Sequence, residues 1–162
     1  MNNSREPFIH RYKQQKPGLD IQVSHRLSWK DIDALLITAF EGGSNYWLAK
    51  AMPMRRAEEI NGTKYESLDP ISWESQFDTE ELKGLGLHYV IPLVEGNYIE
   101  LFEDEEAGNA EHVLLLADVK RGLEVMAKKY TWHWRSVVED THDSETADVF
   151  LQCCIFREIV YS

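Results

Sequence analysis

The sequence predicts an α+β fold, in which an antiparallel sheet of about four strands packs against two or three helices and the C-terminal helix is central. Three observations predict it. The 162 residues are 43% hydrophobic, which is enough for one domain with a sizeable core. Strand-like runs follow one another between residues 87 and 116 instead of alternating with helices, as they would in a parallel α/β sheet. Residues 144–160 are apolar on most sides of a helix, which is typical of a buried helix.

The first residues of the chain differ in character from the rest. Residues 1–18 are polar and carry four basic residues against one acid, so we expect a flexible basic arm in front of a single domain at residues 19–162. No run reaches the roughly 18 apolar residues of a membrane span, and the N-terminus lacks the apolar region of a signal peptide. A cytoplasmic location is therefore expected.

The first elements of the domain are predicted to be a strand and a helix. Residues 20–27 alternate between apolar and polar side chains, which favours a strand with one buried face. Ser28 is then a good helix N-cap, with Asp31 in the first turn. The predicted helix carries an apolar stripe at helical spacing, formed by Ile32, Leu35, Leu36, Ala39 and Phe40.

Two adjacent glycines follow this stripe in the segment 41–47, which reads EGGSNYW. Each glycine inside a helix costs about 1 kcal/mol relative to alanine, so the segment either ends the helix or continues it at a tight spot. In one interpretation the backbone N–H groups cradle a phosphate, and in the other the glycines let two helices pack closely. A small-molecule or nucleotide site here would use Gly42, Gly43, Ser44, Asn45, Tyr46 and Trp47.

The middle of the chain contains the predicted strands. Residues 53–81 are rich in turn signals, with a short strand expected at 71–77. Residues 87–94 and 97–103 predict an antiparallel hairpin, and a third strand is expected at 112–116.

Two helices are predicted to close the domain. Val119, Leu123, Met126 and Tyr130 indicate an amphipathic helix capped near Asp118. The last helix is expected from residue 144 to residue 160. It contains Cys153 and Cys154, which we expect to be reduced and buried, because a thiol in an apolar helix behaves as a small hydrophobe.

Acidic residues are the most distinctive feature of the composition. The chain has 28 Asp and Glu against 17 Lys and Arg, a net charge of -11, which opposes binding to phosphate backbones and anionic membranes. The acids concentrate in residues 58–81 and 95–111, which form either solvated faces or a phosphate-like array for a host protein with a basic nucleic-acid-binding surface. The candidate partner-binding residues are Glu95, Glu100, Glu103, Asp104, Glu105 and Glu106.

No pattern predicts a catalytic nucleophile, a metal site or a cofactor. Ser44 lacks the G-x-S-x-G context, and neighbouring cysteines on a helix point about 100° apart, which makes a shared tetrahedral metal centre difficult. Asp140, His142, Asp143 and Asp148 could be hard metal ligands, but a solvated loop and an N-cap are the expected roles. We therefore expect a protein that is not an enzyme.

The EGGSNYW segment, taken with the C-terminal residues, resembles a group of small, uncharacterised phage and prophage proteins. The shared C-terminal positions are Asp143, Ala147, Asp148, Gln152, and the run from Phe156 to Tyr161. The likeness covers roughly residues 20–162 and departs at Arg157 and Ser162, where glycines are expected. The resemblance implies a viral or mobile-element origin and brings no catalytic residues. With the acidic composition, it leads us to expect a non-enzymatic inhibitor of a host defence complex, similar to an anti-CRISPR protein.

Overall fold

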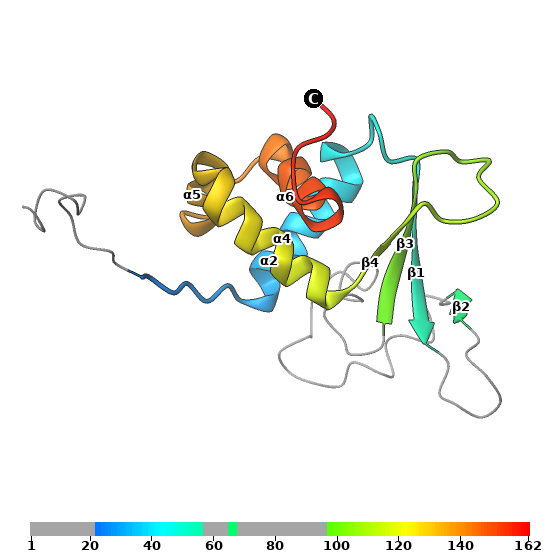
Figure 1. The fold of residues 1–162 in the computed structure, drawn as a ribbon, viewed down its shortest axis with the longest axis horizontal. Helices are drawn as coiled ribbons and strands as arrows, with labels where there is room; N and C mark the ends of the chain where they lie inside the picture. The colour runs from blue at the N-terminus through cyan, green and yellow to red at the C-terminus, as the bar shows by residue number, and fades with distance from the viewer. Residues whose placement is uncertain (1–21, 57–64, 68–96) are drawn as a thin grey trace, which may run out of the picture.

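The computed structural model describes residues 22–56, 65–67 and 97–162 (Figure 1). The α+β prediction is confirmed, because the described residues form helices on one side of the molecule and an antiparallel sheet on the other. The predicted arm, the expected strand at 71–77 and the first strand of the hairpin lie outside the described residues. The elements are α2 (Trp29–Thr38), η1 (Ala39–Gly43), β1 (Lys50–Arg56), β2 (Tyr65–Ser67), β3 (Asn97–Phe102), β4 (His112–Leu114), α4 (Leu116–Lys129), α5 (Thr131–Val138) and α6 (Ser144–Phe156).

The sheet has the strand order β2-β1-β3-β4, and each neighbouring pair is antiparallel. The strand predicted at 97–103 is confirmed as β3, and the one predicted at 112–116 is confirmed in part as β4, because the next helix begins at Leu116. Ile99 pairs with Leu114, and both are fully buried in the core together with Leu101. These side chains share one face of the sheet, because residues two apart along a strand point to the same side.

Helix α2 begins as the sequence predicts. Ser28 forms a capping box with Asp31, whose carboxylate accepts a hydrogen bond from the Ser28 N–H at 2.8 Å. Ile32, Leu35 and Leu36 are buried, which confirms the predicted apolar stripe. The helix then widens into the π-helical turn η1 and ends at Ser44.

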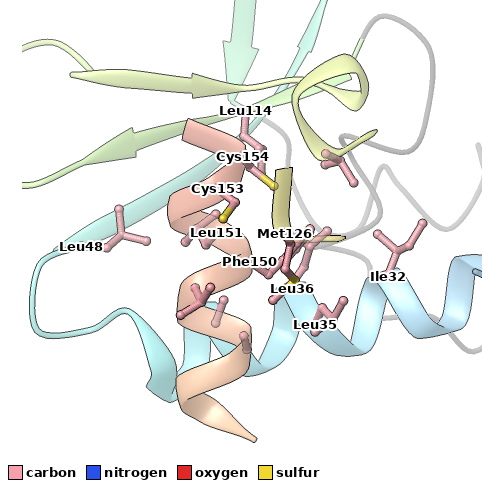
Figure 2. Close-up of a cluster of buried hydrophobic side chains, with 14 of the residues drawn as sticks. Ile32, Leu35, Leu36, Leu48, Leu114, Met126, Phe150, Leu151, Cys153 and Cys154 are labelled. Atoms are coloured by element: carbon pink, nitrogen blue, oxygen red, sulfur yellow. The ribbon is translucent and has the colours of Figure 1, made fainter. Parts of the chain in front are cut away.

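Helix α6 is the centre of the domain, as predicted. It packs against α2, η1, α4 and α5, and its residues from Thr146 to Cys154 are all buried. Figure 2 shows Phe150 of α6 close to Leu36 of α2 and Met126 of α4 inside this core. The predicted C-terminal boundary at residue 160 is wrong. The helix ends at Phe156, because Arg157 adopts a left-handed conformation (φ 67°) that turns the chain away.

The strand predicted at residues 20–27 is also wrong within its described part. Residues 22–28 form no strand and join no sheet, and the Val23 side chain is 72% exposed. Alternation alone predicted this strand, but a strand also needs a partner to accept its backbone hydrogen bonds.

Three elements were missed, the strands β1 and β2 and the helix α5. β1 contains Pro53, which we interpreted as a turn signal. In the structure Pro53 lies opposite Ile99 of β3, and the described residues of β2 pair with Met54 to Arg56. The missed helix is α5, in which the Trp134 N–H donates to the Tyr130 carbonyl at the end of α4.

Candidate functional site

The most unusual site in the described chain is a buried carboxylate, Asp148 of α6, that accepts four hydrogen bonds. The Ser44 hydroxyl and the Trp47 indole N–H both donate to Oδ1 at 2.7 Å. The Tyr46 hydroxyl and the Gln152 amide donate to Oδ2, at 2.8 and 2.7 Å. We call these five residues the carboxylate hub. The expectation that Asp148 lies in a solvated loop or an N-cap is wrong, since the residue is only 6% exposed.

Gly43 allows the EGGSNYW segment to reach α6. A Cβ atom on Gly43 would lie 2.5 Å from the Ser144 carbonyl oxygen and 3.3 Å from the Asp148 backbone nitrogen. Only a glycine fits against the helix backbone at this distance. Gly42, by contrast, faces open space. The interpretation of close helix packing is therefore confirmed at Gly43.

The hub leaves few free groups for a ligand in the EGGSNYW segment. Three side chains of the segment donate to the carboxylate, and a negative charge at the centre of the site opposes a phosphate. Burial and the hydrogen bond to Asp148 raise the pKa of Tyr46 to about 12, so the phenol stays protonated and keeps donating. Asn45 is exposed and takes no part in the hub. The geometry thus favours a structural role over a phosphate cradle.

The hub also anchors the residues that follow α6, which we call the closing segment (residues 157–162). The Gln152 amide oxygen accepts from the backbone N–H groups of Val160 and Tyr161, both at 2.8 Å. Its amide nitrogen donates to the Tyr161 carbonyl at 3.0 Å. The Tyr161 ring stacks on Trp47 with centroids 5.2 Å apart and an interplanar angle of 9°. These contacts fix the direction of the Tyr161 side chain.

Tyr161 reaches from the closing segment to the end of β3. Its hydroxyl donates to Oε2 of Glu103 at 2.7 Å, and His112 of β4 contacts Oε1 at 2.6 Å. We call these three residues the Glu103 clamp. The hydrogen bond from His112 is the main reason that the pKa of Glu103 is lowered, and the hydrogen bond to Glu103 raises the pKa of Tyr161. One candidate partner residue is therefore held within the fold.

The neighbouring acids behave differently. Asp104, Glu105 and Glu106, here called the acidic turn, follow Glu103 and are exposed. Among the residues that the structure describes, none forms an ion pair with them. Their local order comes from hydrogen bonds of the Glu106 and Ala107 N–H groups to Asp104.

Of the other two candidate partner residues, the structure describes only Glu100, which does not join the acidic turn. Glu100 lies inside β3, opposite Val113, and is half-buried. Glu95 lies outside the described residues. Among the five candidates that the structure describes, the three carboxylates of the turn are the exposed ones.

Cys153, Cys154 and His133 take part in packing or hydrogen bonding within the described fold. Both cysteines are free and buried, as expected. Burial raises the pKa of Cys153 to about 12, and burial also raises the pKa of Cys154. His133 is hydrogen-bonded to Thr146 at 3.0 Å. In the parts of the chain that the structure describes, no three His, Cys, Asp or Glu side chains are grouped closely enough for a metal ion. None of the helices in those parts is both long and apolar enough to cross a bilayer.

One pocket was not anticipated from the sequence. It has a volume of about 1380 Å³ and lies between residues 25–32, strands β3 and β4, and one face of α4. Its walls are mainly apolar and include Trp29, Leu123 and Trp134, with no residue of the EGGSNYW segment. The sequence feature that could have indicated this pocket is a second apolar stripe on α4, formed by Leu116, Leu123 and Ala127. It was not recognised because it overlaps the stripe of predicted core residues on the same helix.

Comparison with known proteins yields no relative: no family model, no curated protein and no solved structure matches the chain.

Proposed function

We propose that this protein is a non-enzymatic binding protein whose acidic turn engages a basic, nucleic-acid-binding surface of another protein. The observation that carries the proposal is the acidic turn itself. It presents three adjacent exposed carboxylates, without an ion-pair partner among the described residues, on a turn that is held at its base by the Glu103 clamp. An inhibitor of a host defence complex, of the anti-CRISPR kind, is the specific role we favour.

Charge supports this choice of partner. A chain of net charge -11 is attracted to basic surfaces over a Debye length of about 8–10 Å at ordinary salt, which speeds association. Arginines that bind phosphates also bind carboxylates, often with two parallel hydrogen bonds. The resemblance to phage proteins supports a setting in the cytoplasm of an infected host, where nucleic-acid-guided defence complexes act.

A capture experiment tests the proposal. The wild-type chain and the variant D104S/E105Q/E106Q serve as baits in a bacterial lysate, and mass spectrometry identifies proteins that only the wild type retains. The affinity of the purified partner is then measured by biolayer interferometry at low and high salt. We expect the variant to bind at least tenfold more weakly, which corresponds to about 1.4 kcal/mol, and with a shallower salt dependence.

The matched control is the variant E124Q/E139Q/E145Q, which removes three acidic charges from exposed positions on α4, at the end of α5 and on α6; of these, Glu139 is paired with Arg135. We expect its affinity to stay within about threefold of the wild type, since long-range charge alone contributes little to a docked complex. Equal losses in both variants would mean that net charge, not the turn, drives binding. An unchanged affinity in the turn variant would overturn the proposal.

A second candidate function, binding of an apolar small molecule, is favoured by the pocket beside α4 and not by the EGGSNYW segment. A mainly apolar cavity is the usual site for such ligands. The fluorescent probe 1-anilinonaphthalene-8-sulfonate tests it. Saturable binding that Val113→Glu abolishes would support this function, because Val113 is an exposed residue of the pocket wall. Binding that the substitution does not affect would exclude the pocket as the site.

A further inference from the structure

We propose that Tyr161 is a positioning residue for the acidic turn. Together with His112, its hydroxyl holds Glu103 and thereby sets how Asp104, Glu105 and Glu106 are presented. The consequence for partner binding rests on the proposed function, whereas the effect on the turn does not. Glu103 is then not a contact residue, although it belongs to the same acidic run.

The first step is that the two oxygens of Glu103 are held from two directions. His112 contacts Oε1 at 2.6 Å from β4, and Tyr161 donates to Oε2 at 2.7 Å from the closing segment. The Glu103 backbone N–H donates to the Glu111 carboxylate at 3.1 Å. These contacts join the two ends of the turn where it leaves β3 and enters β4. Among the described basic side chains, only His112 forms a salt bridge or hydrogen bond with Glu103.

The second step is that the position of Tyr161 is fixed independently of the turn. Its backbone is bonded to Gln152 and its ring stacks on Trp47, and both of these residues also donate to Asp148. The Tyr161 hydroxyl therefore connects the carboxylate hub to Glu103, which lies 58 residues earlier in the chain at the base of the acidic turn. This explains why the two segments that carry the phage resemblance meet in one network.

The third step concerns the turn beyond Glu103. Two hydrogen bonds to Asp104 order the acidic turn internally, and its side chains are exposed. A loop that is already in its bound conformation loses less entropy on binding. Fixing Glu103 at the base therefore favours association without adding a contact to the partner.

The test uses Tyr161→Phe, which keeps the ring on Trp47 and every charge but removes the hydroxyl. Hydrogen–deuterium exchange of residues 104–111 should accelerate about two- to tenfold, as expected for the loss of one hydrogen bond. NMR titration should show a higher pKa for Glu103, because Tyr161 helps to lower it. The matched control is Thr38→Val, which removes a hydroxyl that donates to the Ala34 carbonyl within α2, outside the hub and the clamp. It should leave both readouts at their wild-type values.

His112→Ala provides a second variant, since it removes the other half of the clamp from β4. It should accelerate exchange in the same residues. If Tyr161→Phe changes neither the exchange of residues 104–111 nor the pKa of Glu103, the positioning role of Tyr161 is wrong, whatever the effect of His112→Ala.

Partner binding forms a separate arm of the experiment. Tyr161→Phe should weaken binding of the captured partner about two- to fivefold. The same substitution should weaken binding less in a protein that already carries Glu103→Gln, because the effects of two residues in contact do not add. A wild type that captures no basic protein would refute the proposed function while leaving the exchange result valid. Normal exchange with tenfold weaker binding of the turn variant would refute positioning alone.

Discussion

The carboxylate hub and the acidic turn are built from the same functional group and have opposite environments. Asp148 is 6% exposed and receives four hydrogen bonds, from residues four positions away on α6 and about one hundred positions away in the EGGSNYW segment. The acids of the turn are exposed, and no ion pair with a described residue engages them. A carboxylate can be buried only where the fold supplies donors, because an unpaired buried charge is very costly. The difference shows which acids hold the fold together and which remain available to another molecule.

The Glu103 clamp lies between these two regions. Glu103 is part of the acidic run in the sequence, but its carboxylate is bonded to the fold in the same way as Asp148, only nearer to solvent. Glu103 is thus the last acid of the run that is bonded to the fold by its side chain on both oxygens, and the acids after it face solvent. Substitutions in the hub, at Glu103 and in the acidic turn should therefore change the free energy of unfolding to a decreasing extent.

The largest effect is expected for Asp148→Ala. The substitution leaves the donors of Ser44, Trp47 and Gln152 buried without their acceptor, which should lower the free energy of unfolding by about 3–5 kcal/mol. Urea denaturation followed by tryptophan fluorescence measures it. Glu145→Ala, an exposed position one turn earlier on α6, serves as the control and should cost less than about 0.5 kcal/mol. Similar losses at the two positions would contradict the central role of the hub.

The hub could not have been predicted from the sequence by spacing. Asp148 is about one hundred residues from Ser44 and Trp47, and no periodicity links them. The nearby acids at 140, 143 and 145 made Asp148 resemble part of a solvated segment. The resemblance did pair the two segments, but a shared pattern of residues says nothing about contacts. Only the crossing of η1 and α6, which Gly43 permits, brings the donors to the carboxylate.

The fold was more predictable where a local rule decides the structure. The capping box of Ser28 and Asp31 fixes the beginning of α2, and the apolar surface of α6 follows directly from its composition. The rules failed where tertiary contacts decide. Residues 22–28 alternate in polarity but pair with no described strand, and Pro53 is accepted in β1, where it lies opposite Ile99 of β3. The conformation of Arg157 depends on bonds between the closing segment and Gln152, which no local pattern reveals.

A smaller effect is expected for a substitution that tests how the hub is assembled. Gly43→Ala places a Cβ atom against the Ser144 carbonyl, so we expect the free energy of unfolding to fall by about 1–3 kcal/mol. Gly42→Ala is the matched control, because nothing lies within 4 Å of its Cβ position. It should be neutral or slightly stabilising, since alanine favours helix. Thermal melting of the two variants compares them, and equal melting temperatures would show that η1 and α6 are not in close contact.

The boundary residue should show a pH-dependent effect. The folded pKa of Glu103 is lowered, mainly by the hydrogen bond with His112, from an ordinary value of 4.5. A carboxylate with a lowered pKa adds stability above its unfolded pKa and loses it as the pH falls through the folded value. Glu103→Gln should therefore be less stable than the wild type at pH 7, by less than about 1 kcal/mol because the site is partly exposed. The difference should shrink as the pH falls below about 4.5. Urea unfolding at several pH values measures it, and a constant difference would exclude the clamp as its source.

The smallest effect on stability is expected where the effect on binding should be largest. Asp104, Glu105 and Glu106 are exposed and form no ion pair with described residues, so D104S/E105Q/E106Q should change the free energy of unfolding by no more than about 0.5 kcal/mol. The sign is set by two opposing terms. Removing three of 28 acids from a chain of net charge -11 relieves self-repulsion, whereas losing the Asp104 acceptor frees the Glu106 N–H at the surface. Added salt separates them, because screening reduces only the repulsion. At low salt the free energy of unfolding of the variant should thus be slightly higher than that of the wild type, and this difference should disappear at 0.5 M salt.

A free energy of unfolding lower by more than 1 kcal/mol at both salt concentrations would instead place the acidic turn among the groups that hold the fold together. It would also remove the contrast with Asp148 on which the choice of binding surface rests.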